Sequence, residues 1–538
     1  MHARRIALAA ACSAGLLAAP AHATIVDETY SVPTVGGARI SVEVQRDDKF
    51  AHQPIILTYS PYNTLSENPG GSVADDGIAS TYNPKGYARA VADVIGTRNS
   101  TGCWDYGGPR ETQSGVDLVN FLASQPWSNG KVGMIGGSYD GTTANMVASR
   151  GAAAWGLAAI VPQSAINHWY GYAYQDGARY FANSDVPTDE GVDTPAGFDW
   201  GLARTPPTKP DQASILDLPT GRYNPCQSVE HTMYGYDTTP DYNGFWHDRD
   251  YREHAENVRV PILVTHGWQD YNVKQSEGID MYESAVNSPL RMLYMFQGTH
   301  EGPPSAYNPI LAKFWDYTLK GVKNDIEKGP LVYSQGRTGT TPAATVAAIG
   351  DEWPPKHTHE IALELGRDTS GGVLAPKAGG ADASFTDLGT TAEEAILKAG
   401  PSQEKTWLYY QSAPLTQSMR IAGSAILDTV FTDSADHGQL SPVLLDVAPD
   451  GSSSVIARGH MNLQYRDGLD FARTLTPGAA THARVRLAPQ DQTVPAGHRI
   501  GLIYAGSNVV WALPDLPAGN TYSVSNGTSR LLLPITDQ

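Results

Sequence analysis

The stretch VGMIGGSYDG, residues 132–141, places a serine among glycines directly after a short apolar segment. Val132–Ile135 predicts a buried strand, and the residues beyond Gly141 can continue as a helix. A serine at such a strand-to-helix turn lies on a tight bend that tolerates only small neighbours, and its hydroxyl stands above the sheet. Ser138 is therefore a candidate nucleophile. Asp140 occupies the place of the last glycine in the strict G-x-S-x-G pattern, so the alternative is an ordinary glycine-rich turn.

An acidic residue and a histidine follow Ser138 at the ends of two further expected strands. Val260–Val264 is an apolar, β-branched run that leads to Asp270, and Arg291–Phe296 leads to His300. The strand-end loops of a parallel sheet open on one edge, so the three side chains can meet there. A serine hydroxyl needs an imidazole to remove its proton, and a carboxylate orients that imidazole. The order Ser, Asp, His is that of an α/β-hydrolase, and the sequence predicts this fold with Ser138, Asp270 and His300 as catalytic triad.

Several stretches resemble one family of enzymes. Besides the surroundings of Ser138, they are SPYN at 60–63, INHWYGYAYQDGARY at 166–180, FWHDRDY at 245–251, HGWQDYNVKQ at 266–275 and FQGTH at 296–300. They resemble the Xaa-Pro dipeptidyl-peptidase family of serine peptidases, whose relatives include cocaine-esterase-like hydrolases and α-amino-acid ester hydrolases. The resemblance spans nearly the whole mature chain. It implies that Ser138 is the nucleophile, Asp270 the orienting acid and His300 the base.

The resemblance also implies an oxyanion site, made by the phenol of Tyr62 and the backbone N–H of Tyr139. Tyr62 follows the expected strand Ile55–Tyr59, and a phenol is a suitable fixed donor where negative charge develops. The alternative for Tyr62 is a buried aromatic side chain near a strand end. His266 is expected to be an ordinary surface or core histidine.

Residues 1–23 have the three-part pattern of a signal peptide. Arg4 and Arg5 precede an apolar run over residues 6–19, and small residues end the segment at Ala23. We therefore expect export to the periplasm or the medium, with cleavage after Ala23.

The rest of the chain predicts two domains. From residue 24 to 345, strand-like and helical runs alternate, which indicates a parallel sheet covered by helices. A segment at about 165–251, rich in Tyr, Trp, Asp, Gly and Pro, interrupts this domain and is expected to form a cap. From 350 to 538, short β-rich runs separated by turn residues predict a β-sandwich, jelly-roll-like domain.

Composition restricts the partners and cofactors. The formal net charge of −18 disfavours nucleic acid and anionic membranes as partners, and no stretch after the signal approaches the ~20 apolar residues that span a bilayer. Cys103 and Cys226 either form one disulfide in an oxidising compartment or remain two buried thiols. No Cys/His spacing predicts a metal site, and serine chemistry requires no organic cofactor.

A substrate with a free ammonium group requires a carboxylate partner. Asp176 is the preferred candidate because it follows the aromatic cluster of the cap, although an exposed loop carboxylate is the alternative. The other candidates are Asp185, Asp189, Glu190 and Asp193. The aromatic residues expected to line the substrate pocket are Trp169, Tyr170 and Trp268.

The sequence thus predicts a secreted serine hydrolase that releases N-terminal Xaa-Pro dipeptides from peptides. An esterase or acylase that uses the same triad on a small ester or amide is the nearer alternative, because fold and triad do not determine the leaving group. A secreted, non-catalytic binding protein, in which the β domain carries the function, is the remoter one. The oligomeric state is not predicted.

Overall fold

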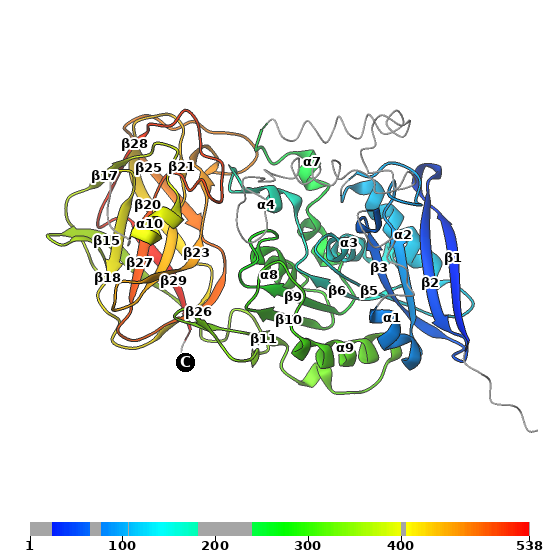
Figure 1. Cartoon of the computed structure of the whole chain (residues 1–538). Helices are drawn as coiled ribbons and strands as arrows, with labels where there is room; N and C mark the ends of the chain where they lie inside the picture. Colours follow the sequence, from blue (N-terminus) through cyan, green and yellow to red (C-terminus); the bar gives the residue numbers. More distant parts are fainter. Residues whose placement is uncertain (1–23, 65–76, 106, 181–238, 400–404, 537–538) are drawn as a thin grey trace, which may run out of the picture.

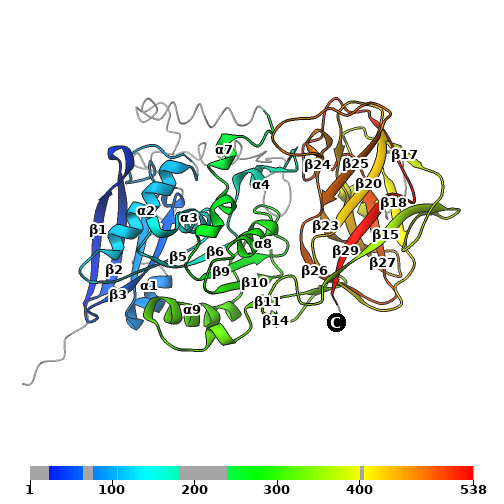
Figure 2. The same ribbon diagram turned by 180° about the vertical axis from the view of Figure 1, so that it is seen from behind.

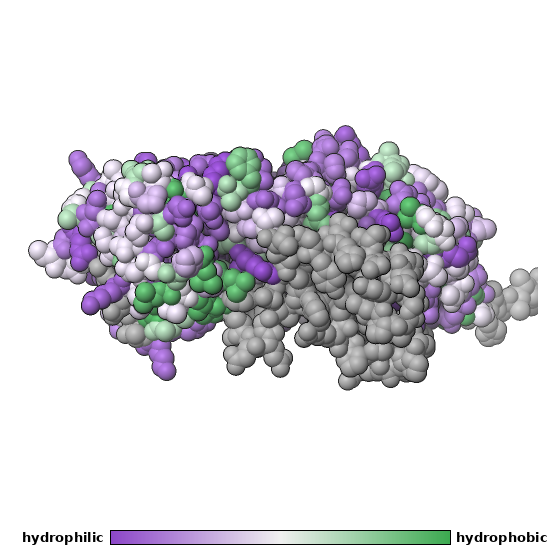
Figure 3. Space-filling model, turned by 90° about the horizontal axis from the view of Figure 1, so that it is seen from above, coloured by the Kyte–Doolittle hydropathy of each residue, from purple (hydrophilic) through white to green (hydrophobic). Residues whose placement is uncertain are grey.

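The structure is a computed structural model that describes residues 24–64, 77–105, 107–180, 239–399 and 405–536. Two bodies lie side by side in both views, an α/β domain and a β domain (Figures 1 and 2). Seen from above, hydrophilic side chains are widespread on the part of the surface that is drawn in colour (Figure 3). Among the described residues, no helix has the length and apolar composition that a membrane crossing needs. The expected signal peptide, residues 1–23, lies outside the described residues.

The α/β domain is built on a ten-stranded sheet with the order β1-β2-β4-β3-β5-β6-β9-β10-β11-β14. The strands from β4 to β11 are parallel, whereas β1, β2 and β14 pair antiparallel with their neighbours. The bounds are β1 Ile25–Pro33, β2 Arg39–Asp47, β3 Gln53–Ser60, β4 Ala88–Asp93, β5 Ser128–Gly137, β6 Leu157–Gln163, β9 Ile262–Gly267, β10 Arg291–Phe296, β11 Val332–Ser334 and β14 Ala347–Gly350.

Helices cover both faces of this sheet (Figure 1). One apolar core joins one face to α2, α3 and α8, and a second core joins the other face to α1 and α9. Strand β3 shows why: Ile55 and Leu57 belong to the first core and Ile56 to the second, so the strand is apolar throughout. The bounds are α1 Gly77–Tyr82, α2 Pro109–Ala123, α3 Tyr139–Ala148, α8 Gln275–Ser284 and α9 Asn308–Lys320.

The expected cap leaves the sheet between the neighbouring strands β6 and β9. Its described parts contain α4 (Trp169–Ala173), β7 (Tyr174–Gln175), β8 (Ala178–Arg179) and α7 (Gly244–His247). Residues 181–238, which make up most of the expected cap, lie outside the described residues.

The β domain surrounds a separate apolar core that includes Leu427, Phe431, Leu444, Leu502 and Leu531. In β25, Thr481, Ala483 and Val485 are buried and the residues between them are exposed, which is the period of a strand with one face on the core. The bounds are β15 His359–Asp368, β16 Gly371–Ala375, β17 Ala383–Thr386, α10 Glu393–Ala399, β18 Leu408–Ser412, β19 Met419–Gly423, β20 Ile426–Asp433, β21 Gln439–Leu440, β22 Val443–Val447, β23 Ser453–Arg458, β24 Met461–Asn462, β25 Ala480–Arg486, β26 Gln490–Val494, β27 Arg499–Tyr504, β28 Thr521–Val524 and β29 Arg530–Thr536.

The chain crosses between the two sheets more than once. After β11, the short strands β12 (Arg337–Thr338) and β13 (Thr341–Pro342) join the sheet of the β domain, where β12 pairs with β26. The chain then returns, and β14 pairs with β11 at the edge of the α/β sheet. The two domains are therefore interleaved around the boundary expected at 345–350.

A buried carboxylate joins the two domains. Asp491 of β26 is 1% exposed and accepts two hydrogen bonds from Arg420 of β19, at 2.8 and 2.9 Å. The hydroxyl of Ser334, at the end of β11, donates to the same carboxylate at 2.7 Å and accepts from the indole of Trp268 at 3.2 Å. The loop that carries Trp268 is thus tied to the β domain.

We expect Asp491→Ala to lower the free energy of unfolding by about 3 kcal/mol, because the guanidinium of Arg420 loses its charged partner inside the protein. Chemical denaturation followed by tryptophan fluorescence measures the change. Lys328→Ala is the matched control: it removes an ion pair with Asp325 in which both side chains are 70% exposed, and it should cost less than about 1 kcal/mol. Equal effects of the two substitutions would contradict a structural role for Asp491.

Candidate active site

Ser138 lies at the turn between β5 and α3 with a backbone conformation that is rare for a residue with a side chain. Its φ is 58° and its ψ is −125°. Two glycines permit the turn, because a Cβ atom on Gly136 would come within 2.3 Å of Asp140 and one on Gly141 within 2.7 Å of the carbonyl of Gly136. Gly137 has open space around its Cα. The turn therefore requires Gly136 and also Gly141, which stands one position after the place of the last glycine in the strict G-x-S-x-G pattern.

Asp270 follows β9 and is fully buried. Its Oδ1 accepts the backbone N–H groups of Asn272 and Val273, at 3.1 and 3.0 Å, and its Oδ2 lies 2.8 Å from Nδ1 of His300, which follows β10. A second imidazole contributes, because Nε2 of His266 lies 3.3 Å from the same Oδ2. Burial alone would raise the pKa of Asp270, but the hydrogen bonds with His266 and His300 outweigh burial and lower the pKa below its usual value.

The loops that carry Asp270 and His300 approach each other closely. The N–H of Gln269 donates to the carbonyl of Gly298 at 3.0 Å. A Cβ atom on Gly267 would lie 2.4 Å from that carbonyl oxygen, so only glycine fits there. The acid and the histidine are therefore held together by backbone contacts as well as by their own hydrogen bond.

The phenol of Tyr62, just after β3, reaches the nucleophile. It donates to Oγ of Ser138 at 3.1 Å and accepts the backbone N–H of Tyr139 at 3.3 Å. Burial, together with the charge of Asp140, raises the pKa of Tyr62 to about 12, so its O–H stays protonated at neutral pH. The structure thus brings Tyr62, Tyr139 and Ser138 together, and Asp270 and His300 together, at one edge of the sheet.

A buried acidic residue, Glu111, supports the turn that carries Ser138, which we call the elbow (residues 136–141). Oε2 of Glu111 accepts hydrogen bonds from the indole of Trp104, the backbone N–H of Gly107 and the phenol of Tyr139, at 2.7, 2.7 and 2.8 Å. Burial raises the pKa of Glu111 to about 7, and the neighbouring Asp105 adds to the shift. This network fixes the residue directly after Ser138.

Helix α4 separates the nucleophile from a cavity on its other side. The ring of Trp169 packs on Tyr139 with centroids 5.3 Å apart, and the indole donates to Tyr251 at 3.1 Å. Tyr170 instead lines the cavity, with its hydroxyl donating to the carbonyl of Pro240 at 2.7 Å. Trp169 is thus placed beside the elbow and Tyr170 is not.

Asp176 lies on the cavity side of α4, together with Tyr170 and Tyr174. Neither Ser138 nor His300 lines that cavity. That Asp176 binds a substrate ammonium beside the triad therefore stays a prediction, since Asp176 lines a cavity that the triad residues do not line. The other candidates, Asp185, Asp189, Glu190 and Asp193, lie outside the described residues.

Trp268 does not contact an open pocket. It is fully buried, its ring packs on Trp353 with centroids 5.2 Å apart, and its N–H donates to Ser334. The expectation that it lines the substrate pocket is wrong, since its place between the two domains gives it a packing role. Cys103 forms a disulfide, and its expected partner Cys226 lies outside the described residues.

The β domain reaches the loop after Asp270. The ring of Trp511 packs on Tyr271 with centroids 5.0 Å apart, and the guanidinium of Arg458 lies 4.6 Å from both rings. Nε of Arg458 is 2.8 Å from each carboxylate oxygen of the buried Glu393. Through this cluster, the β domain packs against the loop that carries Asp270.

Sequence patterns did not identify His266 or Glu111 as parts of the site. His266 stands four residues before Asp270 in the sequence. This short spacing was the one sequence signal that the two side chains could meet. Glu111 has no motif, because its role arises only when α2 packs under the elbow. In the described part of the chain, no cluster of three or more His, Cys, Asp or Glu side chains is suited to hold a metal ion.

Glu111 provides a test through the pH dependence of stability. Its folded-state pKa of about 7 exceeds its ordinary value of 4.5, so between these pH values the native state holds a proton that the unfolded chain releases. The contribution of Glu111 to the free energy of unfolding therefore falls as pH rises, by about 3 kcal/mol in total. Glu111→Gln keeps an acceptor for the three donors and should lose this decline.

Urea denaturation at pH 4.5, 6 and 7.5 measures the difference between the two proteins. The exposed Glu327→Gln serves as the control and should follow the parent chain at every pH. If Glu111→Gln also runs parallel to the parent, the buried carboxyl does not titrate in this range.

Comparison with known proteins places this site in a family. The family model described as X-Pro dipeptidyl-peptidase (S15 family) matches residues 36–302, and that of the X-Pro dipeptidyl-peptidase C-terminal non-catalytic domain matches residues 324–533. A putative Xaa-Pro dipeptidyl-peptidase from Streptomyces avermitilis is 27% identical, over 87% of this chain and 76% of the relative.

Solved structures show the same fold. A CocE/NonD family hydrolase from Staphylococcus aureus has a TM-score of 0.75 at 15% identity, covering 95% of this chain and 94% of that one. An α-amino acid ester hydrolase has a TM-score of 0.70 at 18% identity, covering 97% and 98%. The expected α/β-hydrolase fold is confirmed. The chain is a hydrolase that belongs to the X-Pro dipeptidyl-peptidase (S15) family.

Proposed function

We propose that this chain is an exported serine peptidase that releases Xaa-Pro dipeptides from the free N-termini of peptides. One observation carries the serine mechanism: Tyr62 bonds Ser138 at 3.1 Å at the same sheet edge where Asp270 bonds His300 at 2.8 Å. The choice of peptide substrate is supported by the family models and by curated relatives named Xaa-Pro dipeptidyl-peptidase.

In the first step, Oγ of Ser138 attacks the carbonyl carbon of the scissile bond while Nε2 of His300 accepts the hydroxyl proton. Asp270 holds Nδ1 of His300 and stabilises the imidazolium, and its lowered pKa keeps it ionised throughout. The imidazolium then gives its proton to the leaving amine, and the C–N bond breaks to form an acyl-enzyme. Water attacks this ester through the same base and regenerates the serine hydroxyl.

The tetrahedral intermediate carries a negative oxygen that needs donors. The phenol of Tyr62 and the backbone N–H of Tyr139 converge beside Oγ of Ser138, and both can donate to that oxygen. A phenol whose pKa is about 12 does not lose its proton at neutral pH, so it remains a donor. The network under Glu111 fixes the position of Tyr139.

Export is part of the proposal and rests on the sequence. Residues 1–23 combine two arginines, an apolar run and a small-residue cleavage site, which is the pattern of a secretory signal. The disulfide at Cys103 is consistent with an oxidising compartment, because such bonds are rare in the cytosol.

A small ester or amide is the second candidate substrate. The position of Asp176 favours it, because the carboxylate expected to bind a peptide N-terminus lines a cavity that Ser138 does not line. The serine mechanism would be the same for either substrate.

We expect Tyr62→Phe to lower kcat about a hundredfold, or roughly 3 kcal/mol of transition-state stabilisation, with little change in KM. The substitution removes one oxyanion donor and keeps the ring that packs against Tyr139. Steady-state kinetics measure both constants. Tyr30→Phe, which removes a hydroxyl that bonds Glu28 far from the elbow, should leave them unchanged. An unaltered kcat in Tyr62→Phe would return Tyr62 to a packing role.

The substrate class is tested with Ala-Pro-p-nitroanilide and its N-acetylated form. The peptidase should cleave the free form with a kcat/KM about a hundredfold or more above that of the blocked form, because acetylation removes the charge that the enzyme recognises. Ser138→Ala should abolish both reactions, and a fluorophosphonate should label the parent chain but not this variant. Equal rates on the two anilides, or turnover of simple acyl esters alone, would favour the second candidate. Failure of labelling would exclude a serine mechanism.

A further inference from the structure

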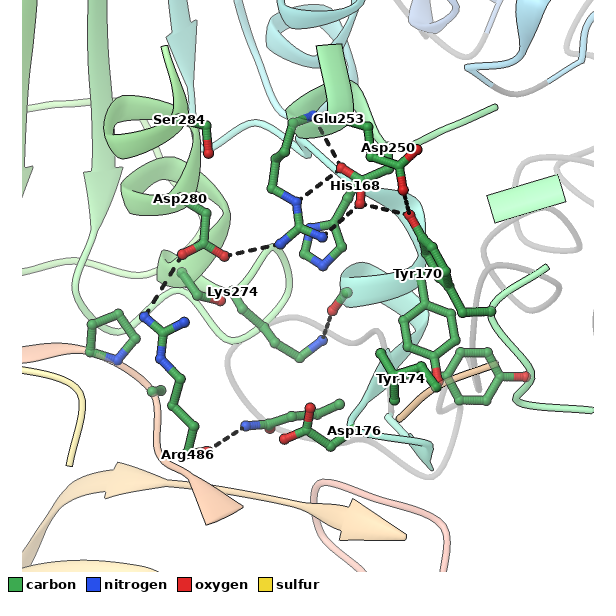
Figure 4. A pocket seen from close by; sticks show the side chains of 18 of the residues that line it. His168, Tyr170, Tyr174, Asp176, Asp250, Glu253, Lys274, Asp280, Ser284 and Arg486 are labelled. Carbon is green, nitrogen blue, oxygen red and sulfur yellow. Dashed lines mark hydrogen bonds and ion pairs between the residues drawn. The ribbon is translucent and has the colours of Figure 1, made fainter. Parts of the chain in front are cut away.

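A cavity of about 620 Å³ lies between the α/β domain and the β domain. Its walls come from α4, from the segment that precedes β9, from α8 and from residues 486–489 of the β domain (Figure 4). None of Ser138, Asp270 and His300 lines it. The volume falls in the range of small-molecule sites, roughly 300–1,000 Å³. The cavity is therefore large enough for a ligand and separate from the triad.

Most of the charges in the cavity wall are paired with one another. Arg252 lies 2.7 Å from Asp250 and 3.4 Å from Asp280, and Asp280 also lies 3.9 Å from Arg486 (Figure 4). The remaining pairs are Glu253 with His247 at 2.7 Å and His168 with Glu277 at 3.1 Å. These groups hold the wall together and leave little charge for a ligand.

Two charged groups have no ionic partner within the described residues. Neither oxygen of Asp176 accepts a hydrogen bond there, and Arg486 and His168 act on it only at longer range. The ammonium of Lys274 donates to the carbonyls of Gly171 and Tyr172, at 2.6 and 3.1 Å, and lies 3.7 Å from the centre of the Tyr180 ring, with no carboxylate at ion-pair distance. The cavity thus presents one negative and one positive group that are not neutralised by each other.

An aromatic surface lies beside these two groups. The rings of Tyr170 and Tyr174 stack with centroids 5.1 Å apart, and Tyr242 meets Tyr170 edge-on at 5.3 Å. Leu469 and Leu487 complete the apolar part of the lining. Tyr170 and Tyr174 are each only 3% exposed, so the half-buried Tyr242 and Leu469 supply the surface that can receive an apolar side chain.

We propose that the cavity binds a small zwitterion with a free ammonium and a free carboxylate, such as an amino acid or a dipeptide. The ammonium pairs with Asp176, the carboxylate pairs with Lys274, and the side chain packs on Tyr242 and Leu469. The site is distinct from the catalytic centre and is additional to the proposed peptidase function.

The energetics of the two charged groups favour such a ligand. Burial raises the pKa of Asp176 to about 6 and lowers that of Lys274 to about 7, so the charged form of each group is disfavoured where it lies. A zwitterion supplies the opposite charge to each group at once and offsets this cost. A ligand with only one charge stabilises the charged form of only one of these two groups.

The site also touches the triad loop. Lys274 follows Val273, whose N–H donates to Asp270, and it directly precedes α8. A ligand held by Lys274 would therefore bind at the end of the loop that positions the catalytic acid.

Isothermal titration of the full chain with glycyl-L-leucine tests the proposal, with N-acetylglycyl-L-leucine and glycyl-L-leucinamide as probes that each lack one charge. We expect saturable binding of glycyl-L-leucine below about 10 mM, and binding about tenfold or more weaker for each single-charge probe. Asp176→Asn should weaken the binding of glycyl-L-leucine to a similar degree. Asparagine suits this position because Asp176 has a φ of 44°, which asparagine tolerates.

Ser284→Ala is the matched control, since it changes a neutral residue of the same wall and should leave binding unaltered. No binding of glycyl-L-leucine up to about 10 mM would overturn the proposal. Unchanged binding in Asp176→Asn, or equal binding of either single-charge probe, would also overturn it. Because the titration needs no turnover and Asp176 lies away from Ser138, its outcome does not depend on whether the peptidase activity is found.

Discussion

A residue with a side chain, held at positive φ, is the constraint on which the rest of the site depends. Ser138 has a φ of 58°, a conformation that costs of order 1–3 kcal/mol and persists only when its surroundings enforce it. The surroundings do so by hydrogen bonds: Ser138 N–H donates to the carbonyl of Gln163 at 2.8 Å, and its own carbonyl accepts the N–H of Thr142 at 3.0 Å. Strand β5 enters the turn and α3 leaves it, so the buried core fixes the hydroxyl above the sheet edge.

Local sequence patterns predicted much of the fold. The apolar run at Arg291–Phe296 matches β10 residue for residue, because it is a buried strand bounded by turn residues. Strand β5 is longer than the expected Val132–Ile135, since it begins at Ser128 and ends at Gly137. Asp270 and His300 were found by their places after two strands, because parallel topology brings such loops together.

The remaining residues of the site depend on tertiary contacts that no local pattern records. Trp268 stands two residues before Asp270, yet it is buried against Trp353 because the β domain packs there. Asp176 follows Trp169, which packs on Tyr139, by only a few residues, yet it lines a cavity that Ser138 does not line, so closeness in the sequence does not imply closeness to Ser138. Glu111 gains its role only from the packing of α2 under Tyr139.

The exchange of strands between the two sheets limits how the chain can be divided into separate domains. Because β12 and β13 belong to the β domain while the later β14 completes the α/β sheet, no single cut in the chain separates the two domains. A fragment that ended before β12 would lack β14 and leave the edge of β11 unpaired, and a fragment that began at β12 would carry β14 without β11. Because unpaired edges invite aggregation, we expect the two domains to fold properly only as parts of one chain.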